Sequence, residues 1–161
     1  MNQPDLKLLA QKKHKETARF LSKLKQSPPR NLDREMESIH DEVFSRTDCL
    51  SCGNCCRTTG PLLTSKDVDV LSHHLRIKPG ELFEKYLRVD EDGDTVFKGM
   101  PCPFLGDDNF CSVYEHRPKA CREYPHTNRK KFYQINELTL KNVAICPAAY
   151  EIVEKMKQSM K

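Results

Sequence analysis

Apolar and small residues recur at steps of three or four along the first part of the chain. The positions concerned are Leu6, Leu9, Ala10, Thr17, Phe20, Leu21 and Leu24. Lys13 is the one interruption of this face. Residues at such spacing share one side of a helix. The pattern therefore predicts an amphipathic helix over roughly residues 5–25, which Pro28 and Pro29 end because proline cannot continue a helix.

Four further helices are predicted, each from its first residues. Asn31 can cap a helix that runs almost to the first cysteine. Thr64 and Asp67 are spaced as a capping box in which Asp replaces the usual Glu, and Pro79 and Pro147 suit a first helical turn. The residues expected to be buried are Leu32, Met36, Ile39 and Val43 in the first of these helices, Val68, Leu71 and Leu75 in the second, Leu82, Phe83, Tyr86 and Leu87 in the third, and Ala148, Ile152, Val153 and Met156 in the last.

Two short segments predict strands. TVFK at 95–98 follows an acidic, glycine-containing turn, and KFYQINELTL at 131–140 alternates between apolar and polar residues, with a possible turn at Asn136 and Glu137. The fold class that follows is α+β, mainly helical, with a small irregular cysteine-rich domain organised around metal and flanked by N- and C-terminal helices. A chain of 161 residues predicts a single compact unit.

Charge divides the chain unevenly. The formal net charge of +4 arises from +6 in residues 1–30 and −2 in residues 31–161. We therefore distinguish a basic amphipathic N-terminal helix or arm, 1–30, from a cysteine-cluster metal-binding domain, 31–161. Nucleic acid is an unlikely partner, because no aromatic residues are interleaved with the basic ones and metal-bound thiolates would offset the positive charge.

Eight cysteines carry the candidate chemistry. Four occur in the string CLSCGNCCR, and four follow singly downstream. The full set of candidate metal ligands is Cys49, Cys52, Cys55, Cys56, Cys102, Cys111, Cys121 and Cys146. Cysteines three positions apart in a tight turn can direct their thiolates onto one centre, and four thiols within eight residues have no packing rationale. Any single downstream cysteine has the alternative of being a buried free thiol.

The division of these ligands into one or two centres is open. Neighbours Cys55 and Cys56 point apart in most backbone conformations, so we expect them to serve different centres unless one is not a ligand. One centre would then use Cys49, Cys52, Cys55 and a remote cysteine, and the other would use Cys56 with the remaining three. The remote ligand is Cys146 or Cys102, because both precede proline, as a ligand does in ferredoxin-like sequences.

The N-terminal sequence affects the choice between metal and disulfides. It contains no apolar run long enough for a secretory signal, and no stretch of the chain is apolar enough to cross a bilayer. We therefore expect a cytoplasmic protein without membrane insertion, in which clustered cysteines bind metal more often than they form disulfides.

Three sequence blocks resemble those of the YkgJ-like cysteine-cluster family, named for a C-x-x-C-x-x-C-C signature. They are CLSCGNCCR at 49–57, PCPFL at 101–105 and CSVYEHRPKACREYP at 111–125, and the resemblance spans roughly 49–146. It implies a zinc- or iron-chelating domain. Some members of the family are labelled iron–sulfur oxidoreductases, and one branch is similar to flagellin lysine methylases.

Charged residues near the cysteines have two interpretations each. Arg57, Arg117 and Arg122 could stabilise a negatively charged thiolate centre or be ordinary loop arginines. His116 and His126 are possible additional ligands, whereas His73 and His74 are expected on a helix surface.

The cofactor predicted from spacing is an iron–sulfur cluster of the [4Fe–4S] type, in a protein with a redox or accessory role. Overlapping C-x-x-C-x-x-C cysteines favour it, since structural zinc sites more often use two separated C-x-x-C pairs. The alternative is a structural zinc module that binds an unknown protein partner. No glycine-rich phosphate loop, serine elbow or carboxylate pair indicates a reaction, so enzymatic activity stays open.

Overall fold

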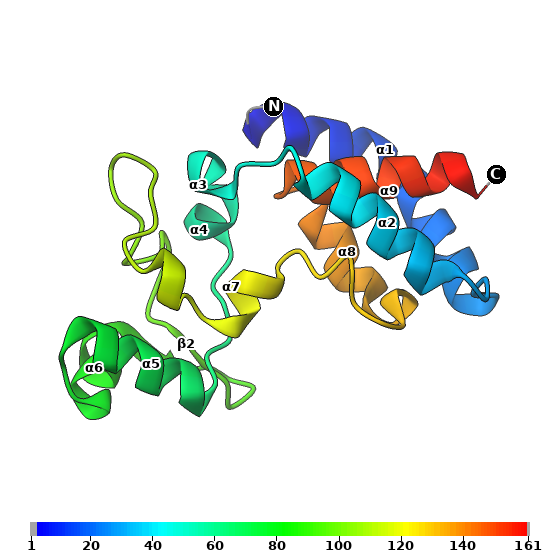
Figure 1. Cartoon of the computed structure of the whole chain (residues 1–161). Helices are drawn as coiled ribbons and strands as arrows, with labels where there is room; N and C mark the ends of the chain where they lie inside the picture. Colours follow the sequence, from blue (N-terminus) through cyan, green and yellow to red (C-terminus); the bar gives the residue numbers. More distant parts are fainter. Residues whose placement is uncertain (1–2, 161) are drawn as a thin grey trace. The chain divides into compact units, whose positions relative to one another are not determined.

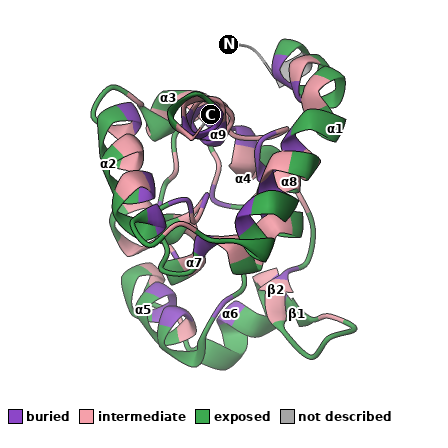
Figure 2. Cartoon of the chain, turned by 90° about the vertical axis from the view of Figure 1, so that its right-hand side faces the viewer, coloured by how far each residue is buried: buried purple, intermediate pink, exposed green. Residues whose placement is uncertain are grey.

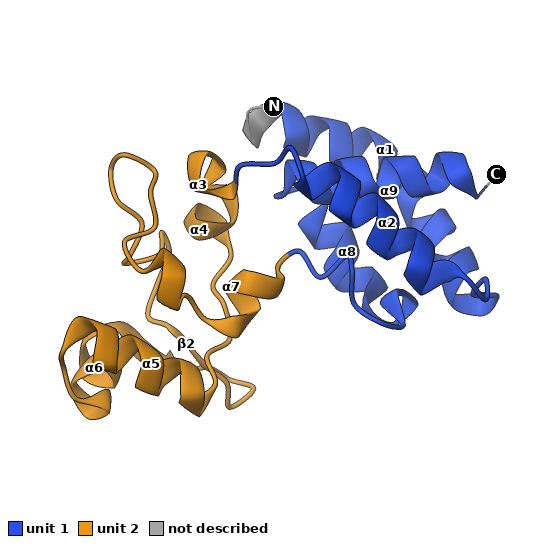
Figure 3. Ribbon diagram, viewed as in Figure 1, with its two compact units in different colours: residues 1–48, 125–161 blue, residues 49–124 orange. Residues whose placement is uncertain are grey.

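The structure is a computed structural model that describes residues 3–160, and the chain divides into two compact units. Unit 1 consists of Met1–Asp48 with Pro125–Lys161, and unit 2 is Cys49–Tyr124 (Figure 3). The expectation of a single compact unit is therefore wrong. Two units form because apolar residues between Leu63 and Val113 pack into a core of their own.

Unit 1 is built from helices at both ends of the sequence. They are α1 (Gln3–Gln26), α2 (Leu32–Phe44), the 3-10 helix η2 (Phe132–Ile135), α8 (Asn136–Asn142) and α9 (Pro147–Ser159) (Figure 1). The predicted helices over 5–25, after Asn31 and from Pro147 are confirmed. Asn31 occupies the N-cap position, but its side chain donates to Glu35 Oε1 over 3.2 Å and makes no capping bond.

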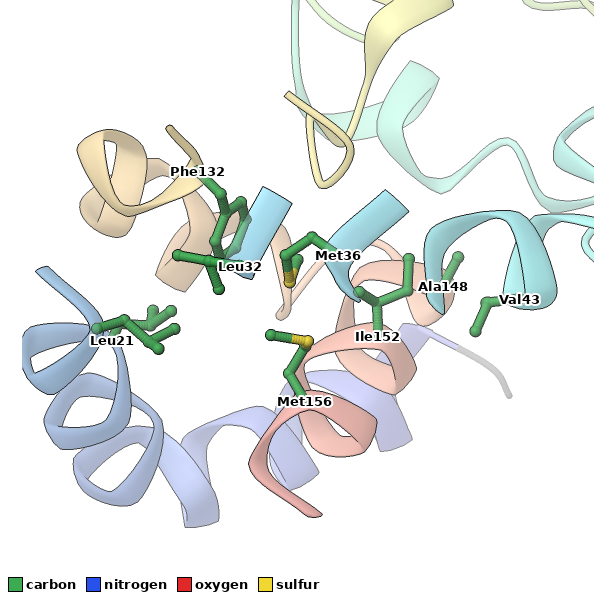
Figure 4. Close-up of a cluster of buried hydrophobic side chains, with 9 residues drawn as sticks. Leu21, Leu32, Met36, Val43, Phe132, Ala148, Ile152 and Met156 are labelled. Carbon is green, nitrogen blue, oxygen red and sulfur yellow. The ribbon is translucent and has the colours of Figure 1, made fainter. Parts of the chain in front are cut away.

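The core of unit 1 lies between α1, α2, η2 and α9. Figure 4 shows Met36 of α2 and Met156 of α9 between their helices, with Phe132 of η2 near Leu32. The buried members are Leu21, Leu24, Leu32, Met36, Val43, Phe132, Ala148, Ile152 and Met156. Burial is confined to one side of α2, whose other faces are exposed (Figure 2). The N-terminal helix thus supplies two leucines to the same core as α2 and α9.

Lys13, which interrupts the apolar face of α1, has a partner on α9. Its ammonium donates to Glu154, and the neighbouring Lys157, only 8% exposed, binds Glu154 at 2.6 Å and Glu16 at 3.1 Å. Burial would raise the pKa of Glu154, but these hydrogen bonds hold it below its ordinary value. The charged pairs connect α1 to α9 beside the apolar core.

The predicted strand at 131–140 is wrong. Residues 132–135 form η2 and residues 136–142 form α8. Lys131 adopts φ 55°, a left-handed turn that interrupts extended backbone, and Asn136 donates from Nδ2 to the Leu21 carbonyl at 2.8 Å. Packing of Phe132 and Asn136 against α1 therefore outweighs the weak alternation of this segment.

Unit 2 combines short helices with one hairpin. Its elements are α3 (Cys49–Cys52), α4 (Asn54–Thr58), α5 (Ser65–Leu75), α6 (Pro79–Tyr86), β1 (Leu87–Val89), β2 (Thr95–Phe97), the 3-10 helix η1 (Tyr114–His116) and α7 (Lys119–Glu123). Strands β1 and β2 are antiparallel, with Leu87 opposite Phe97 and Val89 opposite Thr95. The predicted strand at 95–98 and the helices at 65 and 79 are confirmed, as is the capping box of Thr64 and Asp67.

A second apolar core holds the helical and hairpin part of unit 2. It consists of Leu63, Leu71, Leu82, Leu87, Phe97, Phe104 and Val113. The expectation that Phe83 is buried is wrong, because its side chain is 38% exposed. Taken over residues 3–160, the fold is mainly helical α+β, as predicted, and its one two-stranded sheet pairs β2 with β1, a strand that the sequence did not predict. No helix in this described range combines the length and apolarity needed to cross a membrane.

Candidate metal centre

The first cysteine run occupies two short helices joined by a glycine. Cys49 and Cys52 are the ends of α3, and Cys55 and Cys56 lie on α4. Gly53 between them has φ 59°, a left-handed conformation that glycine adopts without a Cβ penalty. The chain therefore reverses inside the run, as the sequence predicts for a metal-binding turn.

The Cys55 side chain is a hydrogen-bond partner of Cys56, and the assignment of the two cysteines to different centres stays a prediction. Both belong to α4, where consecutive side chains are separated by only about 100° around the axis. The hydrogen bond from Cys55 lowers the pKa of Cys56 to about 7, and the charges of Arg57 and Arg117 act in the same direction. Cys56 is consequently the thiol most readily ionised among those with a shifted pKa.

Cys56 lies close to three downstream cysteines. The backbone N–H of Cys102 donates to the Cys56 carbonyl at 2.7 Å. Burial, together with the charges of the other thiols, raises the pKa of Cys102 to about 11 and that of Cys121 to about 12. The pKa of Cys111 is also raised, by burial and by the charge of Cys56. As anions these four thiols would repel one another, and a bound cation would relieve that repulsion.

Secondary structure positions each of these downstream thiols. Cys111 forms an isolated antiparallel bridge with Leu105, and Cys121 lies on α7. Helix α7 is held at its start because the Lys119 N–H donates to Asp67 Oδ1 at 3.0 Å. Asp67 thereby connects the capping box of α5 to the helix that carries Cys121.

Cys146 belongs to unit 1, where it has a structural contact. Its Sγ accepts a hydrogen bond from the Ala149 N–H at 3.4 Å at the start of α9. The side chain also packs against both apolar clusters of that unit. Cys146 is thus placed among helices, while the other seven cysteines are in unit 2.

The arginines near the cysteines differ in what they contact. Arg117 lies over the Tyr114 ring, 3.7 Å from its centroid. Its charge contributes to the lowered pKa of Cys56 and opposes the rise in the pKa of Cys111 and Cys121. The charge of Arg57 lowers the pKa of Cys56. These two supply the cationic environment that the sequence suggests for thiolates.

Arg122 and the histidines have other surroundings. Arg122 donates to the Arg117 carbonyl at 2.5 Å, and its charge helps to lower the pKa of Asp67. His116 stacks on His74 with 4.1 Å between ring centroids, and its buried Nδ1 has no hydrogen-bond partner. His73 and His74 are exposed on α5, as expected, whereas His126 falls in unit 1.

The donor set fits a thiolate-bound metal in its chemistry. None of the eight cysteines, all within the described residues, forms a disulfide. Over residues 3–160 no three Cys, His, Asp or Glu side chains converge as a preformed metal site. Soft thiolates with nearby arginines nevertheless suit zinc or an iron–sulfur cluster and do not suit hard cations such as Mg²⁺.

Two residues of this region were not singled out from the sequence for a role beside the cysteines. Asp67 was assigned only to a capping box, and its second hydrogen bond reaches α7. Asn109, at φ 72°, donates from Nδ2 to the Ser51 carbonyl at 2.6 Å. The available signal was the string GDDN before Cys111, since Asn tolerates left-handed backbone at turns.

Comparison with known proteins identifies the family. A family model named CxxCxxCC and described as "Putative zinc- or iron-chelating domain" matches residues 48–140. The uncharacterized protein MJ0661 of Methanocaldococcus jannaschii is 32% identical over 82 residues, which are 49% of this chain and 44% of that protein. This chain therefore aligns with less than half the length of that relative, and no solved structure matches it. Since the family model covers more than half of its residues, the chain belongs to the CxxCxxCC family of zinc- or iron-chelating domains.

Proposed function

We propose that this protein holds an iron–sulfur cluster through Cys56, Cys102, Cys111 and Cys121 and serves a redox or accessory role. The observation that supports the proposal is that all four cysteines lie in unit 2, where the Cys102 N–H donates to the Cys56 carbonyl at 2.7 Å. Cysteine thiolates are the ligands of such clusters, which supply one-electron transfer when bound. The overlapping spacing of Cys49, Cys52 and Cys55 supports iron–sulfur over zinc as the kind of centre that this protein binds.

A second centre is proposed for the other cysteines of unit 2. Cys49, Cys52 and Cys55 have the overlapping spacing of cluster ligands. Exposed Cys49 and half-buried Cys52 are accessible from solvent. Such accessibility suits exchange of electrons or metal with a partner protein.

This chain's own residues would tune the first centre. Arg117 and Arg57 offset the negative charge of four thiolates, and burial of Cys102 and Cys121 limits the access of water. Reduced solvent access and nearby positive charge act in opposite directions on the stability of an anionic cluster.

The test is elemental analysis with an acid-labile sulfide assay on protein purified without oxygen. Iron and sulfide in comparable amounts support the cluster. Zinc without sulfide in the same preparation would reject it and favour the alternative, a structural zinc module. Anaerobic handling is essential because oxygen destroys clusters and allows zinc to occupy the thiolate site.

A further inference from the structure

The loop before Cys111 is a tight turn with an asparagine near its tip. The Gly106 N–H donates to the Phe110 carbonyl at 2.8 Å, and the Asn109 N–H donates to the Gly106 carbonyl at 3.0 Å. Asp108 closes the turn by accepting from the Phe110 N–H at 3.1 Å. The turn therefore holds the Asn109 backbone at its left-handed φ of 72°.

The side-chain amide of Asn109 reaches the first cysteine run, more than fifty residues earlier in the chain. Its Nδ2 donates to the Ser51 carbonyl at 2.6 Å, and its Oδ1 accepts from Arg57. The same guanidinium donates to the Cys52 carbonyl at 3.1 Å and reaches Asn54 Oδ1 at 3.4 Å. Both polar ends of the amide are thus used, and we call this arrangement the Asn109–Arg57 clamp.

Gly53 fits under the clamp because it lacks a side chain. A Cβ at this position would lie 2.5 Å from Asn109 Oδ1 and 2.9 Å from its Cγ. The positive φ of Gly53 independently favours glycine. The turn inside the cysteine run and the loop before Cys111 are therefore shaped to each other.

A backbone hydrogen bond joins the same two segments. At the far end of the run, the Cys102 N–H donates to the Cys56 carbonyl at 2.7 Å. The clamp and this backbone hydrogen bond thus both join the first cysteine run to the segment that carries Cys102 and Cys111. Helices α3 and α4, with four and five residues, are too short to hold a fixed orientation by themselves.

We infer that Asn109 is a positioning residue for the metal centre, which fixes the first cysteine run against the loop that leads to Cys111. The inference rests on the proposed function, since it concerns how the cysteines are arranged for metal. Asn109 contributes no ligand atom itself. Outer residues that orient ligands typically change metal affinity by about 10–100-fold when they are replaced.

The experiment uses the reduced, metal-free full chain loaded with Co²⁺, whose thiolate charge-transfer bands report the coordination geometry. Asn109→Gly retains the positive φ and removes the amide, while Asn109→Asp retains the acceptor for Arg57 and loses the donor to Ser51. Asp107→Ala is the matched control, because Asp107 is exposed in the same loop. Transfer of Co²⁺ to an excess of chelator gives the dissociation rate.

The expected result for Asn109→Gly is Co²⁺ dissociation about tenfold or more faster than wild type, with altered charge-transfer bands. The dissociation rate of Asn109→Asp should lie between those of Asn109→Gly and wild type, and the rate of Asp107→Ala should match wild type. Dissociation from both Asn109 variants within about twofold of wild type, with unchanged bands, would overturn the role of Asn109. If Asn109→Gly fails to fold by circular dichroism, the comparison of Asn109→Asp with Asp107→Ala decides.

Failure of the proposed function has a different signature. A wild-type chain that takes up neither Co²⁺ nor iron would refute the metal site itself. Normal uptake by wild type with unchanged release from the Asn109 variants would remove only the positioning role.

Discussion

The Asp67 carboxylate accepts a hydrogen bond from the backbone N–H of Lys119 at 3.0 Å, across 52 residues of sequence. Its other oxygen accepts from the Thr64 N–H and hydroxyl, each at 2.8 Å. One buried side chain thus caps α5 and anchors the start of α7, two residues before Cys121. Helix α7 has only five residues, so this bond contributes much of its orientation.

Substitution of Asp67 should destabilise unit 2. Asp67→Asn replaces one accepting oxygen by an NH₂ group, which cannot accept from the Lys119 or Thr64 N–H. We expect a loss of about 1–2 kcal/mol in the free energy of unfolding, measured by urea denaturation. Asp69→Asn, exposed on the same helix, is the control and should change stability by less than about 0.5 kcal/mol. Equal effects of the two variants would contradict the anchoring role.

Glu154 should contribute more to the stability of the fold than Glu151, although both residues lie on α9 and form ion pairs. Glu154→Gln leaves Lys157, 8% exposed, with a single carboxylate partner in Glu16, and we expect a loss of about 1–3 kcal/mol. Glu151 pairs with Arg46, whose side chain is 53% exposed, so Glu151→Gln should cost less than about 1 kcal/mol. Thermal unfolding of both variants measures the difference, and the reverse order would contradict the assignment.

Acid should weaken unit 1 through the same glutamate. The pKa of Glu154 lies below its ordinary value of 4.5, so the unfolded chain binds the proton more readily than the folded chain. Its contribution is complete above about pH 5 and declines as the pH falls through the folded pKa. Urea midpoints between about pH 6 and 3 should fall less steeply in Glu154→Gln than in wild type. Parallel curves for the two proteins would exclude this contribution.

Metal removal should affect the two units differently. Helices α3, α4 and α7 are four or five residues long, and the apolar core of unit 2 lies in its other segments. After chelation we expect amide protection to fall over residues 49–60 and 101–124, while α1, α2 and α9 remain protected by their own core. Hydrogen exchange monitored by mass spectrometry tests this, and unchanged protection in both cysteine segments would contradict it.

Substitution of single cysteines should divide the metal content into two sets. Cys121→Ser should remove the centre assigned to Cys56, and Cys52→Ser should remove the other. If Cys146 is the fourth ligand of that other centre, Cys146→Ser should lose as much metal as Cys52→Ser, and the double variant should lose no more. Full metal content in Cys146→Ser would show that this thiol only caps α9, consistent with its contact to the Ala149 N–H.

Several features followed from the sequence because local chemistry determines them. The helices beginning near Asn31, Thr64, Pro79 and Pro147 have N-terminal residues that suit a first turn whatever surrounds them. The cysteine spacing likewise identifies metal binding without knowledge of the fold, because two intervening residues let neighbouring thiols share a centre. The family match to residues 48–140 agrees with that interpretation.

Other features depend on contacts between residues that are distant in sequence, which local patterns do not encode. The alternation at 131–140 predicted a strand, but burial of Phe132 against unit 1 makes the segment helical. Lys13 was an unexplained polar residue until α9 brought Glu154 beside it. The partner of Asn109 is a carbonyl 58 residues away, a contact that no local pattern indicates. The sequence alone therefore determined the helices and the metal-binding residue types, whereas only the tertiary structure decided which of those residues meet, because burial and hydrogen bonding across long loops select among locally equivalent alternatives.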